Sequence, residues 1–144
     1  MKFMIAAFVD SNILLYSVSQ QDEDRSKRKI ARKLLEGGNT SFTLSVQVLN
    51  EFLNIATHPK KHRMSRDEAA HHTRTYRRTY PIVSLDQATH ELSMTWYLPK
   101  HLGLWDSLIV ASANLANCDT LYSEDMNHGQ TFGNVTIIDP FREE

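Results

Sequence analysis

The apolar run at the amino terminus is the feature that most constrains the fold. Positions 3–9 read Phe-Met-Ile-Ala-Ala-Phe-Val without a polar interruption, and Asp10 follows directly. A continuous run of this length, unlike an alternating one, is typical of a strand buried on both faces of a parallel sheet. Helices must cover both faces of such a sheet, so the run predicts an α/β fold. Asp10 would mark the carboxyl end of the first strand.

Short strand patterns and helix patterns alternate along the rest of the chain. We expect strands at 41–45, 81–85, 120–123 and 135–138, and helices at 24–35, 46–57, 65–78, 86–98 and 104–117. Positions 11–16 are expected to begin a further helix, and the Gly-containing segment 124–133 is expected to be a loop. Together the patterns predict one domain over residues 1–144, a three-layer α/β/α sandwich around a mainly parallel sheet of about four to five strands.

Composition limits the setting in which such a domain works. The chain of 144 residues has one cysteine, Cys118, which cannot form an intrachain disulfide and suits a reducing compartment. No stretch approaches the ~18 consecutive apolar residues of a membrane span. Asp10 also interrupts the first run before it resembles a signal sequence. We therefore expect a cytoplasmic protein without a membrane function.

The net charge of −1 conceals an asymmetry. Residues 1–83 carry 14 Lys and Arg against 8 Asp and Glu, whereas residues 84–144 carry 2 against 9. Two basic segments, 25–33 and 60–78, account for most of the excess, and tyrosines are interleaved in the second. These basic segments can be solvated helix faces, or they can form a surface that binds single-stranded nucleic acid.

Four acidic residues are the best candidates for chemistry. Asp10 and Asp125 follow strand patterns, Glu51 lies on the edge of an apolar helix face, and Asp106 lies in the first turn of a helix. Because sites in parallel sheets form at the carboxyl ends of the strands, Asp10 and Asp125 should face one crevice. Like charges held together require a cation or protons, so the set predicts a divalent metal site.

Each acid also has a structural explanation. Asp10 suits a helix N-cap, and Asp106 suits the positive end of a helix dipole. Glu51 at the edge of its apolar stripe can be tolerated if the carboxylate reaches water. The fourth ligand has two candidates, because Glu124 precedes Asp125 and either carboxylate can bind the metal.

Four short motifs together resemble a known family. They are Phe-Val-Asp-Ser-Asn at 8–12, Val-Leu-Asn-Glu-Phe at 48–52, Trp-Asp-Ser-Leu-Ile-Val-Ala at 105–111, and Leu-Tyr-Ser-Glu-Asp-Met at 121–126 with Gly129 beyond it. In this order they are similar to PIN-domain ribonucleases, specifically to the toxin component of VapBC-type toxin–antitoxin pairs. Ser11 stands where Thr is frequent in that family, and Ser107 where Ala is frequent.

The resemblance implies a PIN-like fold and a metal-dependent endoribonuclease that hydrolyses RNA. It implies that Asp10, Glu51, Asp106 and Asp125 hold one or two Mg²⁺ or Mn²⁺ ions, that Asn12 and Ser123 support them, and that Glu124 is the possible alternate ligand. It further implies a homodimer and a cognate antitoxin that neutralises the enzyme. The alternatives are a PIN nuclease that is not a toxin, and a non-catalytic module that binds RNA or a partner.

An aspartyl-phosphate enzyme is a less favoured interpretation. Asp10 at a strand end would then be the nucleophile. Haloacid-dehalogenase-like phosphatases need a second Asp two residues later, and Asn12 occupies that position.

Overall fold

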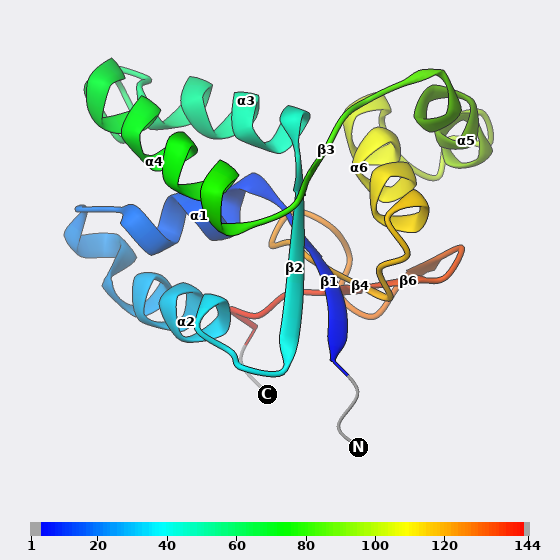
Figure 1. The fold of residues 1–144 in the computed structure, drawn as a ribbon, viewed down its shortest axis with the longest axis horizontal. Helices are drawn as coiled ribbons and strands as arrows, with labels where there is room; N and C mark the ends of the chain where they lie inside the picture. The colour runs from blue at the N-terminus through cyan, green and yellow to red at the C-terminus, as the bar shows by residue number, and fades with distance from the viewer. Residues whose placement is uncertain (1–3, 143–144) are drawn as a thin grey trace.

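The computed structural model describes residues 4–142 and confirms a mainly parallel α/β sheet. Its strands are β1 (Ile5–Val9), β2 (Thr40–Ser45), β3 (Ile82–Val83), β4 (Thr120–Tyr122), β5 (Thr131–Phe132) and β6 (Val135–Ile138). They lie in the order β3-β2-β1-β4-β6-β5 (Figure 1). All neighbours are parallel except β5 and β6, which pair antiparallel.

The sheet has six strands, so the prediction of four to five was too low. The additional strand, β5, lies within the segment 124–133 that was predicted to be a loop. It contains two residues and turns directly into β6 at Gly133, whose φ of +62° suits glycine. A strand of two residues is too short for any apolar alternation to reveal it.

Within residues 4–142, six α-helices and one 3₁₀ turn enclose the sheet. They are α1 (Ser11–Val18), η1 (Asp22–Asp24), α2 (Arg25–Leu35), α3 (Val46–Ala56), α4 (Arg66–Thr79), α5 (Gln87–Tyr97) and α6 (Leu104–Leu115). Helices α1 to α4 lie on one side of the strands and α5 and α6 on the other, which gives the expected three layers (Figure 1). Among the described residues, none of the helices combines the length and apolarity needed to cross a membrane.

Side-chain caps stabilise several helix starts. The hydroxyls of Ser45 and Ser65 accept hydrogen bonds from main-chain amides three residues later, at 3.2 and 3.1 Å. A reciprocal capping box joins Asp86 and Thr89. These local signals explain why the predicted helix boundaries agree with the structure to within a few residues.

The end of strand β1 positions Asp10, the first of the candidate site residues. Ala7, Phe8 and Val9 have no exposed surface, so burial on both faces is confirmed for this half, whereas Ile5 is 44% exposed. Position 3 of the predicted run lies outside the described residues. Val9 pairs with Tyr122 of β4, and the amide of Asp10 donates to the Tyr122 carbonyl at 3.0 Å. Two parallel strands therefore end side by side, which brings Asp10 next to the segment after β4.

Candidate active site

Asp10 is the buried centre of the site. Its carboxylate is 4% exposed and accepts two close hydrogen bonds, from the Ser11 amide and the Ser123 hydroxyl, both at 2.7 Å. The Asn12 amide nitrogen lies 3.4 Å from the same carboxylate. The predicted N-cap function is therefore present, because Asp10 precedes α1 and accepts from its first amide. Capping does not require burial among other acids, so it does not account for the whole arrangement.

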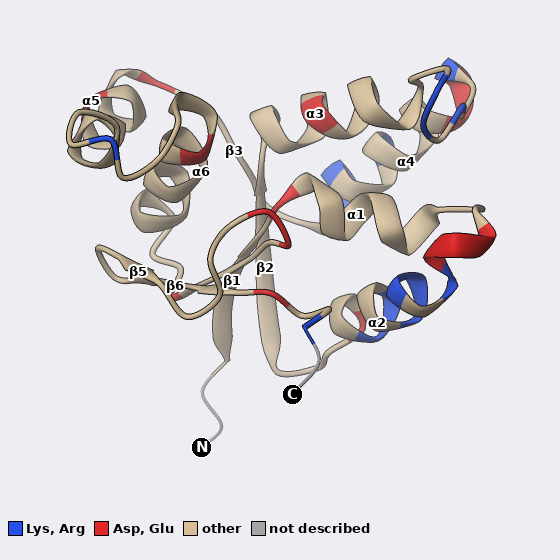
Figure 2. Cartoon of the chain, turned by 180° about the vertical axis from the view of Figure 1, so that it is seen from behind, with Lys and Arg blue, Asp and Glu red and all other residues tan. Residues whose placement is uncertain are grey.

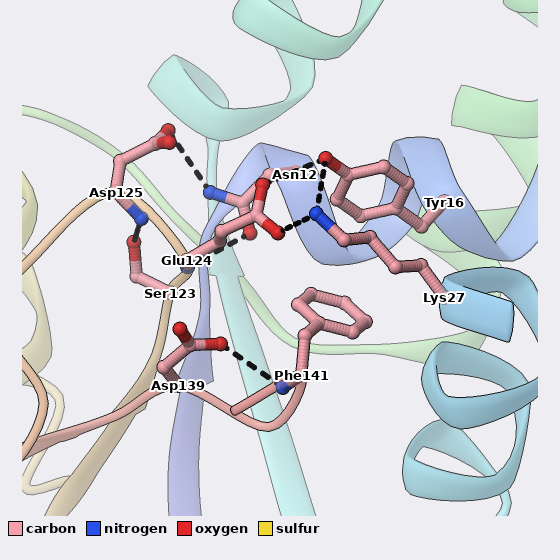
Figure 3. Close-up of polar contacts among 8 residues, drawn as sticks. All are labelled: Asn12, Tyr16, Lys27, Ser123, Glu124, Asp125, Asp139 and Phe141. Atoms are coloured by element: carbon pink, nitrogen blue, oxygen red, sulfur yellow. Dashed lines mark hydrogen bonds and ion pairs between the residues drawn. The ribbon is translucent and has the colours of Figure 1, made fainter. Parts of the chain in front are cut away.

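Asn12 links Asp10 to the segment that follows β4. Its side-chain nitrogen donates to Asp125 Oδ2 at 3.1 Å, and its side-chain oxygen accepts from the Glu124 amide at 3.3 Å (Figure 3). The Ser123 hydroxyl also accepts from the Asp125 amide at 3.2 Å. Asn12 and Ser123 thus contact the predicted acids in the positions expected of supporting residues.

Glu51 and Asp106 complete the set from the helices. Ser11 Oγ lies 3.3 Å from Glu51 Oε2, and Gln47 Nε2 donates to Glu51 Oε1 at 3.1 Å. Glu51 is partly buried on α3, and Asp106 is partly buried in the first turn of α6. Figure 2 shows acidic segments on α3, α6 and the start of α1 around the carboxyl ends of the strands. The fold therefore gathers acids that lie up to 115 residues apart in the sequence.

The pKa values record how closely these acids influence one another. Burial raises the pKa of Asp10 from 3.8 to about 7; the hydrogen bonds from Ser123 and Ser11 oppose this, and the charges of Glu51 and Asp125 add to it. Burial, followed by the charges of Asp125 and Glu51, also raises the pKa of Asp106. Neither ion pair found among residues 4–142, Arg25–Asp22 and Lys27–Glu124, involves any of the four acids. Within residues 4–142, no Lys or Arg forms an ion pair with the cluster.

Glu124 occupies a different environment from Asp125. Its carboxylate forms an ion pair with Lys27 and accepts a hydrogen bond from the Tyr16 hydroxyl at 2.7 Å. Phe141 packs edge-on against Tyr16 with ring centroids 5.0 Å apart, and the Lys27 ammonium lies over both rings. Figure 3 shows the carboxylates of Glu124 and Asp125 pointing in different directions. Glu124 is therefore neutralised by partners, whereas Asp125 is directed toward Asn12.

The donor chemistry of the acids fits a hard divalent cation. All four supply carboxylate oxygens, which Mg²⁺ and Mn²⁺ prefer. In the described part of the chain, however, no three His, Cys, Asp or Glu side chains are already arranged to hold one ion. Mg²⁺ commonly uses only one or two protein carboxylates and completes its shell with water and substrate phosphate oxygens. The arrangement thus suits an open, incompletely formed site.

Two surface grooves reach this cluster from different sides. One, of about 660 Å³, includes Glu51 in its lining together with Gln47 and Trp105. The other, of about 440 Å³, includes Asn12 and Asp125, and its lining also contains the basic or neutral side chains of Lys60, Lys61 and His62 and the acids Glu23, Asp24 and Glu124.

Only part of the predicted basic surface reaches the site. Lys60 and Lys61 line the second groove, whereas the basic residues of α2 other than Lys27 line a separate groove that shares no residue with it. Figure 2 shows this concentration of Lys and Arg on α2. Arg28 donates to the main-chain carbonyl of Ser19, just after α1, and Arg32 donates to that of Ser17, within α1. Both hydrogen bonds are 2.8 Å long. These two arginines, like Lys27, have structural partners.

Two contacts that support the acidic side chains were not predicted from the sequence. Gln47 precedes Glu51 by four residues on α3, and this spacing is itself a signal that the two side chains meet on a helix surface. The ion pair between Lys27 and Glu124 spans 97 residues and leaves no local signal in the sequence.

The chain belongs to the PIN domain family, whose model matches residues 7–131. Solved structures with similar folds come from toxin–antitoxin systems. A toxin–antitoxin complex from Klebsiella pneumoniae is 22% identical, with a TM-score of 0.66 over 93% of this chain and 97% of that chain. VapC20 of Mycobacterium tuberculosis, a sarcin-ricin loop cleaving toxin, is 17% identical, with a TM-score of 0.65 over 83% and 89%.

A third similar structure is VapBC2 from Rickettsia felis bound to a DNA fragment from its promoter. It is 16% identical, with a TM-score of 0.59 over 92% of this chain and 97% of that chain. A search of curated proteins gave no sequence match. At these identities the similarity establishes the fold.

Proposed function

We propose that this protein is a Mg²⁺- or Mn²⁺-dependent endoribonuclease that acts as the toxin of a toxin–antitoxin pair. One observation carries the proposal: a carboxylate buried at the end of β1, with its pKa raised to about 7, is surrounded by acids that have no cation among the described ion pairs. A structural N-cap needs none of these neighbours. The similar structures support the biological class, because they include a toxin–antitoxin complex and a toxin that cleaves the sarcin-ricin loop.

In this proposal Asp10, Glu51, Asp106 and Asp125 hold one or two ions. A bound ion supplies a water of lowered pKa and stabilises charge on the phosphate oxygens. Ser123 and the Ser11 amide orient Asp10, while Asn12 orients Asp125. Gln47 and Ser11 orient Glu51. Because Asp10 has a raised pKa, its carboxyl releases a proton when a cation binds near neutral pH.

RNA would bind across the cluster. Lys60 and Lys61 in the second groove lie where they can neutralise phosphates, which supply most of the sequence-independent affinity for nucleic acid. A cognate antitoxin and a homodimer complete the proposal. The antitoxin is supported by the toxin–antitoxin complexes among the similar structures, and the homodimer is what the resemblance to VapBC-type toxins implies.

Removal of the metal tests the proposal. Purified protein should cleave a defined single-stranded RNA in Mg²⁺ or Mn²⁺, lose cleavage in excess EDTA, and regain it when metal is restored. Gel analysis of end-labelled RNA measures all three conditions. Cleavage that persists in EDTA would contradict the metal mechanism. RNA binding without cleavage in any metal would favour a non-catalytic module.

The fourth acidic position provides a second prediction. Asp125→Asn should lower cleavage by about 10- to 100-fold or more, because it removes a proposed ligand. Glu124→Gln is the matched neighbour and should retain cleavage within a few-fold, because its carboxylate is paired with Lys27 and Tyr16. The variant should lose roughly 1 kcal/mol of stability with this partly exposed pair. The reverse order of activities would assign the ligand to Glu124.

A further inference from the structure

The groove beside Glu51 has an unusual concentration of exposed apolar side chains. Val46, Leu85 and Trp105 line it and are 40%, 39% and 62% exposed. They come from the start of α3, the segment after β3 and the first turn of α6, so the fold brings them together from three places. A grouped set of exposed large apolar residues typically marks a binding surface.

Amide side chains give the same groove hydrogen-bonding capacity. Asn50 and Asn54 line it, and so does Gln47, which is only 6% exposed. Gln47 Nε2 is oriented by two acceptors, Glu51 Oε1 at 3.1 Å and the Trp105 carbonyl at 3.2 Å. Since the nitrogen faces these acceptors, Oε1 is left as a buried acceptor without a partner.

We propose that this groove binds a nucleobase of single-stranded RNA adjacent to the cleaved phosphate. Trp105 provides the stacking surface, and the amides provide partners for the polar edge of the base. A nucleobase has two apolar faces and an edge of donors and acceptors, which matches this combination of side chains. The inference rests on the proposed nuclease function, because Glu51 belongs both to the groove and to the acid cluster.

The polar lining favours a base over a second protein copy. An apolar protein surface placed here would leave the amides and the Glu51 carboxylate without partners, which is costly in a buried interface. The groove on the opposite side of the cluster carries Lys60 and Lys61. The two grooves differ in their linings, with Lys60 and Lys61 in one and Trp105 in the other, so we assign the base to the Trp105 side.

Tryptophan fluorescence tests stacking directly, because the chain has only two tryptophans and Trp96 is 8% exposed. A Trp96→Phe variant leaves Trp105 as the only reporter. It should be titrated, in EDTA and again with Ca²⁺, with a six-nucleotide single-stranded RNA and with an abasic oligonucleotide of the same phosphate number. We expect the RNA to quench Trp105 emission and the abasic oligonucleotide to leave it unchanged.

A second measurement is independent of Trp96. In the otherwise natural chain, Trp105→Ala should weaken binding of the fluorescently labelled RNA by roughly 5- to 100-fold, and Trp105→Phe should restore most of the affinity. Tyr97→Ala is the matched control, because Tyr97 is an exposed aromatic residue outside this groove. It should bind RNA like the unmodified protein.

The outcomes separate this inference from the nuclease function. Equal quenching by abasic and natural RNA, or unchanged affinity in Trp105→Ala, would overturn the base site even if cleavage requires metal. Base-dependent quenching without any cleavage would support the base site and contradict the nuclease. A Trp105→Ala variant that changes from dimer to monomer in sedimentation while its RNA affinity is unchanged would assign the groove to a second copy and overturn the inference.

Discussion

Asp10→Asn is expected to reduce metal-dependent RNA cleavage by about 10²- to 10³-fold or more. Asp10 is the most buried of the four acids and lies at the carboxyl end of β1, where Ser11, Asn12 and Ser123 orient it. Loss of a ligand removes several kcal/mol of charge stabilisation in the transition state, and each 1.4 kcal/mol corresponds to about tenfold in rate. Single-turnover cleavage of a defined RNA, with enzyme in excess, measures the change.

The substitution should leave the fold intact. An asparagine keeps an oxygen that can accept from the Ser11 amide, so the cap of α1 is retained, and it removes a buried charge. Asp119→Asn is the matched control, because Asp119 is an exposed acid before β4 whose carboxylate accepts a hydrogen bond from the neighbouring Thr120 hydroxyl. Circular dichroism should be unchanged in both variants. Full cleavage by Asp10→Asn would contradict the proposed role of Asp10.

The sequence was sufficient to predict the layers of the fold because its signals are local. An apolar run defines β1, and Ser45, Ser65 and Asp86 define helix starts through contacts within three residues. The two-residue strand β5 was missed because its existence depends on pairing with β6, not on its own composition. Local pattern therefore predicts elements well and predicts the edge of the sheet poorly.

In the candidate site, too, some features could be predicted from local sequence patterns and others could not. The positions of Asp10 and Asp125 follow from strand ends, a general property of parallel sheets. The choice between Glu124 and Asp125 depends on Lys27 and Tyr16, which lie about a hundred residues earlier and contact Glu124. No local spacing in the sequence predicts a contact over that separation. Exposure of Trp105 beside an apolar helix face was equally hidden, because the same helical stripe is compatible with burial.

The second large effect is expected in the pH dependence of stability without metal. The pKa of Asp10 is about 7 in the folded protein and 3.8 in its ordinary state. Between these values the folded state holds a proton that the unfolded state has released, so the unfolding free energy falls as pH rises. The contribution is fully present below about pH 4 and is lost by about pH 7 to 8. Its size is on the order of 4 kcal/mol.

Urea unfolding in EDTA, from pH 4.5 to 8.5, measures this dependence. Other groups also titrate, so the informative quantity is the difference between the natural protein and Asp10→Asn. The variant should have the flatter profile and should be the more stable protein above pH 7, because it carries no buried charge. Asp119→Asn should follow the natural profile. Parallel curves for the natural protein and Asp10→Asn would show that Asp10 titrates normally.

Metal should narrow the difference in stability between the natural protein and Asp10→Asn at high pH. Mn²⁺ binds the folded cluster and competes with the proton on Asp10, so its stabilising effect should grow as pH rises from 5 to 8. At a hundred times the dissociation constant the gain is about 2.7 kcal/mol, or roughly 5 to 10 °C in Tm for a chain of this size. Asp10→Asn should gain much less at every pH. Because this measurement contains no RNA, it separates failure of the metal site from failure to find the right substrate: an equal gain in both proteins would place the ion elsewhere.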